Sequence, residues 1–153
     1  MSVDNTIEIT DAAKDWKGSI VALLKTEKLP VEDLPPSLNN FFMAIEKNKR
    51  VVGIIGLEQY GNFGLLRSMA VDRNFRNKGI AGKLIALLEA KAKASGLHSI
   101  YLLTETAGQY FEKKNYKRIE RDSVPEAIKV SSEFSTVCPV SAIVMKKSIR
   151  LHE

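Results

Sequence analysis

The sequence predicts a mixed α/β domain with a mostly antiparallel sheet and one pair of parallel strands. Three strand-like apolar runs, at 41–45, 50–58 and 65–71, are joined by short turns, which is typical of an antiparallel meander. An amphipathic helix beginning at Ile80 follows the third run, and a strand over 99–103 follows that helix. A strand, a helix and a strand in this order predict a crossover between two parallel strands.

Shorter elements are expected on both sides of this central unit. A strand at 7–9 precedes a helix whose apolar residues recur at helical spacing from Trp16 to Leu24. The segment 29–36 holds three of the five prolines and predicts a loop, which either contacts substrate or merely connects two elements. The expected downstream elements are a helix at 107–114, a strand at 116–119, a helix within 124–134 and a strand at 141–149.

Composition excludes several classes of protein. The chain has 153 residues with 44% hydrophobic content, so we expect one globular domain over residues 1–153 rather than a disordered chain. The longest apolar runs, such as 20–24, are far shorter than the ~20 residues of a membrane span, and the first residues lack a secretory signal. One cysteine and two histidines are too few for a disulfide or a familiar metal site. We therefore expect a soluble, cytoplasmic protein without a metal.

The segment 73–83 concentrates the positive charge of a chain whose net charge is +5. It holds four cations beside Gly79 and Gly82 and lies where the amphipathic helix begins. Unpaired N–H groups at a helix N-terminus bind phosphate, and glycines allow an anion to approach the backbone closely. The segment fits a pyrophosphate cradle, although it matches neither the Walker A loop nor the three-glycine dinucleotide fingerprint. Charge and glycines alone describe a solvated turn equally well.

Spacing decides between these interpretations. The pattern Arg76-x-x-Gly79-x-Ala81, after a strand and at the start of a helix, resembles the acetyl-CoA signature of the GNAT N-acetyltransferases. The segment 107–116, Ala-Gly-Gln-Tyr-Phe-Glu-Lys-Lys-Asn-Tyr, resembles the second conserved segment of that family. The order of elements also agrees, so the resemblance covers nearly the whole chain. It implies the GNAT acyl-CoA N-acyltransferase fold, with a central splayed pair of parallel strands and helices on both faces of the sheet.

A finer resemblance concerns the acceptor. The segments 64–71, 101–107 and 133–142 resemble the GNAT branch associated with arsenic-resistance operons. This resemblance implies acetylation of small amines or amino-acid-like toxins.

The family resemblance also implies a cosubstrate site and a mechanism. Acetyl-CoA would lie with its pantetheine arm between the splayed strands, and the acceptor amine would attack the acetyl group directly in a ternary complex. Catalysis then consists largely of positioning the two reactants. The cofactor-binding residues implied in this way are Met69, Ala70, Val71, Arg76, Asn77, Lys78, Gly79, Ile80, Ala81, Gly82, Thr104, Tyr110 and Phe111.

The residues for proton transfer depart from the family pattern. The tyrosine that often protonates the departing thiolate aligns with Phe111, which has no proton to give. Tyr110 is adjacent, but neighbouring side chains on a helix point about 100° apart, so it cannot simply substitute. Glu58, near the end of its strand, and Glu105, just beyond the splay, are the candidate catalytic bases. An exposed structural carboxylate is the alternative for each, and the residues alone favour it.

Three further residues are candidates for acceptor binding. Arg67 and Ser68 lie on the central strand, where alternation sends one to each face. A central arginine needs an anionic partner, either a substrate carboxylate, which we favour slightly, or an internal acid such as Glu58. Cys138 has no histidine convincingly beside it, so lining the acceptor pocket fits it better than nucleophilic catalysis.

Other functions and partners stay open. A GNAT-like module that binds acetyl-CoA without turnover is one alternative, supported by the missing tyrosine, and peptide or protein amines are alternative acceptors. Nucleic acid is not an expected partner, because the basic segment lacks the interleaved aromatics of common RNA-binding modules, and no membrane partner is expected. The resemblance suggests a homodimer, with 140–149 either forming an edge of the sheet or lying within it.

Overall fold

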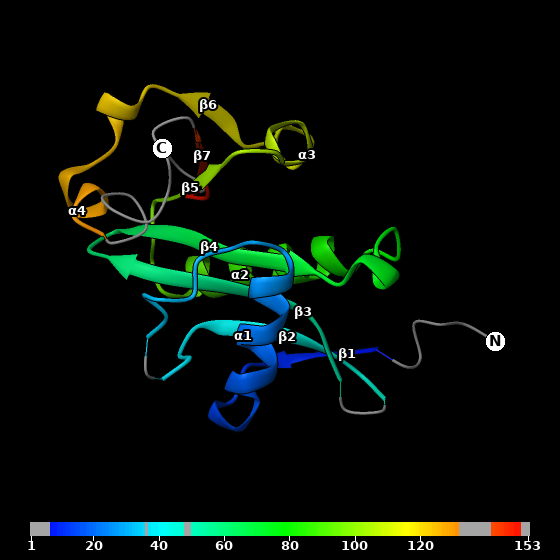
Figure 1. Cartoon of the computed structure of the whole chain (residues 1–153). Coiled ribbons are helices and arrows are strands. Elements are labelled where there is room, and N and C mark those ends of the chain that lie inside the picture. Colours follow the sequence, from blue (N-terminus) through cyan, green and yellow to red (C-terminus); the bar gives the residue numbers. More distant parts are fainter. Residues whose placement is uncertain (1–6, 36, 48–49, 132–141, 151–153) are drawn as a thin grey trace. The chain divides into compact units, whose positions relative to one another are not determined.

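The computed structural model describes residues 7–35, 37–47, 50–131 and 142–150. Its strands are β1 (Ile7–Asp11), β2 (Phe41–Glu46), β3 (Arg50–Tyr60), β4 (Phe63–Val71), β5 (Ser99–Thr104), β6 (Lys117–Ile119) and β7 (Ile143–Ser148). Its helices are α1 (Lys17–Thr26), α2 (Ile80–Ala94), α3 (Gly108–Lys113) and α4 (Glu126–Lys129), with 3-10 turns η2 (Lys14–Trp16), η3 (Arg73–Phe75) and η4 (Arg121–Ser123). The order of elements is the predicted one (Figure 1).

The chain divides into two compact units. One contains Met1–Gly56 and Ser68–Lys91, and the other contains Leu57–Arg67 and Ala92–Glu153. The divisions fall inside β3, β4 and α2, so each of these elements contributes residues to both units. The single domain expected over the whole chain stays a prediction.

The strands are hydrogen-bonded in the order β1-β2-β3-β4-β5-β7-β6. β2 and β3 pair antiparallel, as the short turn between them predicted, and β4 is the next neighbour of β3. β1 is antiparallel to β2, a pairing that the sequence did not predict. β4 and β5 pair parallel, with Phe63 opposite Ser99 and Leu65 opposite Tyr101, which confirms the crossover. β7 is antiparallel to both β5 and β6. The last strand therefore lies within the sheet, which settles the two placements left open for it.

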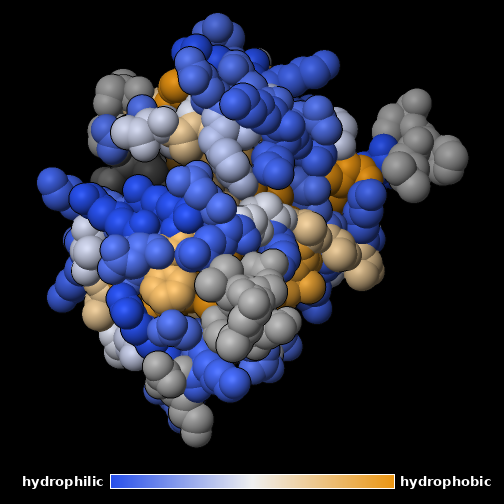
Figure 2. Space-filling model, turned by 90° about the vertical axis from the view of Figure 1, so that its right-hand side faces the viewer, coloured by the Kyte–Doolittle hydropathy of each residue, from blue (hydrophilic) through white to orange (hydrophobic). Residues whose placement is uncertain are grey.

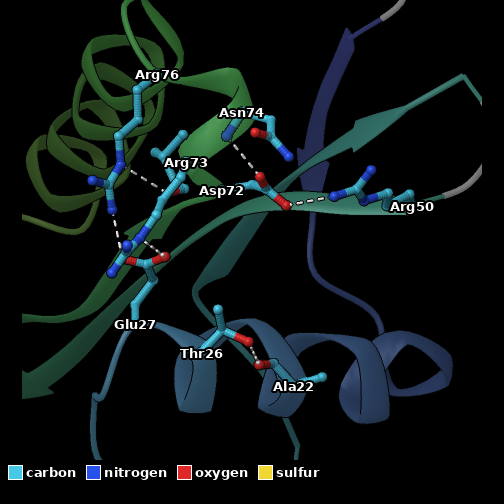
Figure 3. A network of polar contacts seen from close by, with 9 residues as sticks. Ala22, Thr26, Glu27, Arg50, Asp72, Arg73, Asn74 and Arg76 are labelled. Atoms are coloured by element: carbon cyan, nitrogen blue, oxygen red, sulfur yellow. Dashed lines mark hydrogen bonds and ion pairs between the residues drawn. The ribbon is translucent and has the colours of Figure 1, made fainter.

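The core of the first unit forms where α1 packs on the strands. α1 buries Ile20, Leu23 and Leu24, whose spacing puts them on one helical face, and they cluster with side chains of β2 and β3. A Cβ at Gly56 would overlap the ring of Phe41, so glycine is needed there for the aromatic ring to pack against the neighbouring strand. This packing places the C-terminal end of α1 beside the residues that follow β4 (Figure 3).

The second unit has its own apolar cluster. Leu65, Tyr101 and Val144 come from β4, β5 and β7, and Val124 and Ile128 from the α4 region complete the cluster. α4 covers only four residues of the helix expected within 124–134, and residues 132–134 lie outside the described part of the chain. Ile128, its buried residue, is the one that anchors it to the cluster.

The surface of the described residues is largely hydrophilic. Among them Val130 is the one large hydrophobic residue that is exposed. Figure 2 shows mostly hydrophilic side chains over the face that it presents. Within the described ranges, no helix has both the length and the apolar character that crossing a membrane requires.

Candidate functional site

The loop between β4 and α2 has the backbone geometry of an anion site. Asn77 and Gly79 have φ angles of 65° and 80°, in the left-handed region, immediately before α2 begins at Ile80. The N–H of Lys83 donates to the carbonyl of Gly79 at 3.1 Å. The N–H groups before Lys83 precede this first helical bond and carry the partial positive charge of a helix N-terminus. Left-handed residues beside such a terminus form a concave set of N–H donors that suits a phosphate group.

The side chains of this loop divide between solvent and core. Asn77 and Gly79 are exposed, whereas Lys78, Ala81 and Gly82 are partly buried. Ile80 is buried, and its side chain lies 3.1 Å from the position that a Cβ on Gly53 would occupy. Ile80 therefore belongs to the core, and only its backbone can serve the predicted cosubstrate site.

Polar contacts brace the first turn of the loop. The carboxylate of Asp72 accepts from the N–H of Asn74 at 2.9 Å and from Nη2 of Arg50 at 2.7 Å (Figure 3). The guanidinium of Arg50 also lies 5.5 Å from the ring centroid of Phe75, a cation–π distance. These contacts hold η3 against the start of β3.

Arg76, the first residue of the predicted signature, is engaged by the protein itself. Its Nε donates to the carbonyl of Val71 at 3.2 Å and its Nη2 donates to Oε1 of Glu27 at 2.5 Å. Nε of Arg73 lies 3.6 Å from Oε2 of the same Glu27. Half of the Arg76 side chain is still exposed, so the guanidinium can also meet a ligand. Sequence reasoning missed Glu27, because it lies 49 positions from Arg76 and no local pattern marks it.

β4 changes conformation next to the residues predicted to hold the pantetheine arm. Ser68 has a φ of 59°, although it is neither glycine nor in a turn. Arg67 and Ser68 are both buried. Alternation along a strand assumes extended backbone, so the division of these two side chains between the two faces of β4 stays a prediction. β4 pairs with β5 over Phe63–Leu65 only. The residues Met69–Val71 lie beyond this pairing. Of these last residues, Val71 already accepts a hydrogen bond from Arg76.

Glu58 and Arg67 form an ion pair in the second unit. Nη1 of Arg67 donates to Oε2 of Glu58 at 3.0 Å, and the hydroxyl of Tyr60 donates to Oε1 at 2.7 Å. The Arg67 side chain has no exposed surface and that of Glu58 is 19% exposed. Of the two partners considered for Arg67, the internal acid is the one found. A clamp on a substrate carboxylate stays a prediction, and it requires a guanidinium that a ligand can reach.

Tyr60 is the functional candidate that sequence reasoning missed in this cluster. Burial raises its pKa above the usual value, and the hydrogen bond to Glu58 and the charge of Glu58 raise it further. The positive charge of Arg67 and a hydrogen bond with Ser131 act in the opposite direction. A signal was present, because Glu58 and Tyr60 are two apart on one strand and so share a face.

The elements after β5 hold the remaining predicted residues. Oγ1 of Thr104 accepts from the N–H of Ala107 at 3.0 Å, which connects the end of β5 to the start of α3. Glu105 is exposed in the bend between these elements. Phe111 is buried edge-to-face against Tyr110 and Tyr116, at centroid distances of 5.6 and 5.4 Å. Thr104 and Phe111 therefore contact other parts of the protein, and their roles in binding the cosubstrate stay predictions.

Residues 9–118 match the model of the acetyltransferase (GNAT) family, which is well over half of the chain. The chain belongs to the GNAT family. The GNAT fold predicted from the two motifs is confirmed, including the parallel pair of β4 and β5.

The sequences of related proteins match parts of this GNAT chain. An uncharacterized N-acetyltransferase of Chlorobaculum tepidum is 33% identical over 102 residues, 66% of this chain and 64% of its own length. The amino-acid acetyltransferase of Ectopseudomonas mendocina is 30% identical over 64 residues, 42% of this chain and 15% of its own length. The matched parts thus cover less than two thirds of each of these relatives.

Solved structures share the GNAT fold over nearly the whole chain. A GNAT acetyltransferase from Staphylococcus aureus superposes with a TM-score of 0.76 at 24% identity, covering 94% of this chain and 99% of that one. N-acetylglutamate synthase from Neisseria gonorrhoeae, solved with coenzyme A and N-acetyl-glutamate, gives a TM-score of 0.80 at 16% identity. That match covers 95% of this chain and 35% of the synthase. At these identities the likeness concerns the fold alone.

Two further predictions about this GNAT chain concern Cys138 and metal binding. Cys138 lies outside the described residues, so its predicted place in the acceptor pocket stays a prediction. Over the ranges that the structure describes, there is no group of three or more His, Cys, Asp or Glu side chains that could hold a metal ion.

The raised pKa of Tyr60 predicts a loss of stability at alkaline pH. A tyrosine whose pKa is higher in the folded than in the unfolded state stabilises the fold below the unfolded value of about 10, and this contribution is lost as pH rises further. We expect the free energy of unfolding to fall above pH 10 and Tyr60→Phe to make this fall less steep. Urea unfolding between pH 8 and 11 measures the slope.

Tyr101 and Tyr110 also contribute to the alkaline slope, because burial raises the pKa of each. Burial alone accounts for both shifts, without a carboxylate. Part of the alkaline slope should therefore survive in Tyr60→Phe. An unchanged slope in this variant contradicts the assignment of the raised pKa to Tyr60.

Proposed function

We propose that this chain is an acetyl-CoA-dependent N-acetyltransferase that acetylates the primary amine of a small, amino-acid-like molecule. The observation that carries the proposal is the loop before α2, where left-handed Asn77 and Gly79 precede a helix N-terminus among cations. This loop contains the signature Arg76-x-x-Gly79-x-Ala81 in a chain that belongs to the GNAT family. Backbone donors and cations in this arrangement suit the pyrophosphate of a coenzyme A derivative.

Residues of the first unit would hold the cosubstrate. The N–H groups from Gly79 to Gly82 would bind the pyrophosphate, with charge from Lys78 and Arg76. The space around Gly79 supports this fit, because no atom of the described residues lies within 4 Å of the position that its Cβ would occupy. The backbone of Met69 and Ala70 would pair with the pantetheine arm, since both lie beyond the part of β4 that pairs with β5.

Residues of the second unit would carry out proton transfer. Acetyl-CoA supplies the acetyl group as a thioester, and the acceptor amine must be neutral to attack it. We propose Glu58 as the group that takes the amine proton, with Arg67 and Tyr60 holding its carboxylate in a fixed orientation. Glu105 is the second candidate, and its exposed position in a bend gives it less fixed geometry. Catalytic groups on rigid strands are positioned more accurately than groups in bends.

Two comparisons support an amino-acid-like acceptor. One relative is named an amino-acid acetyltransferase, and one structural neighbour was solved with N-acetyl-glutamate. Arg67 forms an ion pair with Glu58 in the second unit, so it gives no support for a carboxylate on the acceptor. The resemblance to the arsenic-resistance branch adds phosphinic and arsenical amino-acid analogues as acceptors to test.

Release of free thiol from acetyl-CoA across a panel of amino acids, these analogues and polyamines tests the activity. We expect one small amine to drive release, and Glu58→Gln to lower kcat by about 10²-fold or more, because general base catalysis contributes that much. Glu105→Gln should retain activity close to that of the unaltered protein. The reverse result for the two variants would transfer the role to Glu105.

A binding module without turnover is the second candidate, and the burial of Phe111 favours it. Phe111 occupies the position of the usual tyrosine and packs among aromatic rings, so it cannot protonate a thiolate. Calorimetric binding of acetyl-CoA without thiol release for any amine would support this candidate. Absence of binding would contradict both.

A further inference from the structure

Glu27 has a largely buried side chain at the junction of α1 and the loop that follows β4. It is the C-cap residue of α1, and its side chain is only 10% exposed. Arg76 and Arg73 both point toward it in Figure 3, with nitrogen–oxygen distances of 2.5 and 3.6 Å. One carboxylate thus contacts two cations of the basic segment 73–83.

The position of Glu27 is unfavourable for a carboxylate by itself. The C-terminal end of a helix carries partial negative charge, and burial disfavours an ionised group. Oε2 of Glu27 is buried and has no hydrogen-bond partner among the described residues, so the ion pair with Arg73 compensates its charge there. The contacts with the two arginines are therefore what make the charge tolerable at this place.

The contact with Glu27 also restricts Arg76. The guanidinium is held by two acceptors on different elements, Oε1 of Glu27 after α1 and the carbonyl of Val71 at the end of β4. Only two of its five N–H donors are used in these contacts, and half of the side chain is exposed. A free arginine loses much rotamer freedom when it binds an anion, and a guanidinium already held in place loses less.

We propose that Glu27 is a positioning residue for anion binding by the loop before α2. It holds the guanidinium of Arg76 against Val71, so that the remaining N–H donors have a fixed orientation before the anion binds. The inference rests on the proposed function, because the anion concerned is the pyrophosphate of acetyl-CoA. The opposite effect, in which Glu27 competes with the anion for Arg76, gives an opposite sign in the test.

Calorimetric titration with acetyl-CoA tests this role in Glu27→Ala, Arg76→Ala and the double variant. We expect Glu27→Ala to raise the dissociation constant about three- to tenfold, the effect of leaving one long side chain to be ordered on binding. In the Arg76→Ala background, Glu27→Ala should add nothing, because the two residues act through one another. With an active acceptor in hand, KM for acetyl-CoA should rise and kcat should stay unchanged.

Two variants keep the test independent of folding and of net charge. Glu27→Gln retains an oxygen that can accept from Nη2 of Arg76, so its affinity should lie between those of Glu27→Ala and the unaltered protein. Glu126→Ala removes the same charge from α4, where the side chain is 87% exposed, and should leave affinity unchanged.

The outcomes separate this inference from the proposed function. If the unaltered protein does not bind acetyl-CoA, both are overturned. If it binds and Glu27→Ala binds as tightly or more tightly, only the positioning role is overturned. A loss of affinity that persists in the Arg76→Ala background also overturns it, since Glu27 would then act on the fold in general.

Discussion

Replacing Gly79 by valine is expected to raise the dissociation constant for acetyl-CoA at least about tenfold, because a β-branched residue resists the left-handed region by roughly 1–2 kcal/mol or more. Gly79 has a φ of 80°, and its Cβ position has no neighbour within 4 Å in the part of the chain that the structure describes. The strain therefore comes from the backbone and not from a clash. Relieving it turns the N–H groups at the start of α2 away from the position in which they would bind pyrophosphate.

Calorimetry with acetyl-CoA, together with thermal unfolding, measures this effect. Gly79→Asn is the matched variant, since asparagine tolerates the left-handed region and should bind nearly as the unaltered protein does. Gly18→Ala is the second control, because Gly18 lies in α1 with open space around it. It should raise the free energy of unfolding by about 0.5–1 kcal/mol and leave binding unchanged. Undiminished affinity in Gly79→Val would show that the loop backbone is not the anion site.

Glu58→Ala is expected to lower the free energy of unfolding by about 3–5 kcal/mol, the typical result of removing one member of a buried ion pair. The variant leaves the fully buried guanidinium of Arg67 without its carboxylate, and removes the acceptor of the Tyr60 hydroxyl. For a chain of this size the midpoint of thermal unfolding should fall by roughly 10 °C. Circular dichroism during heating, and urea unfolding at neutral pH, measure the change.

Replacing both members of the pair separates burial of a charge from loss of packing. The double variant Glu58→Leu with Arg67→Met removes both charges at similar volume and should be clearly more stable than Glu58→Ala. Its acetyltransferase activity should nevertheless be absent if Glu58 takes the amine proton. A Glu58→Ala protein that unfolds at the temperature of the unaltered one would contradict the structural role of the pair.

Local patterns predicted much of the fold. The meander follows from apolar runs joined by short turns, and α2 and the crossover follow from the 3.6-residue apolar period between the third run and the next one. The structure has all three. Boundaries were less well predicted: β3 extends to Tyr60, and the helix within 124–134 shortens to Glu126–Lys129. Such ends depend on tertiary packing, here of Ile128 in the apolar cluster of the second unit.

The candidate site was predicted in part. The loop from Arg76 to Gly82 could be predicted because its glycine and cation spacing is local and precedes an amphipathic helix. The left-handed φ of Ser68 could not be predicted, because serine rarely adopts this conformation and the neighbouring residues do not indicate it. Alternation assumes extended backbone, so the division of Arg67 and Ser68 between two faces stays a prediction.

Local sequence was enough to predict the order of helices and strands and the place of the loop before α2, since both depend on neighbouring residues. Tertiary structure decided which partners the arginines take. Arg76 meets Glu27 from 49 positions away, and Arg67 meets Glu58 from 9 positions away on the neighbouring strand. An arginine reaches any carboxylate that packing brings near, so its partner follows from how helices and strands pack rather than from spacing along the chain.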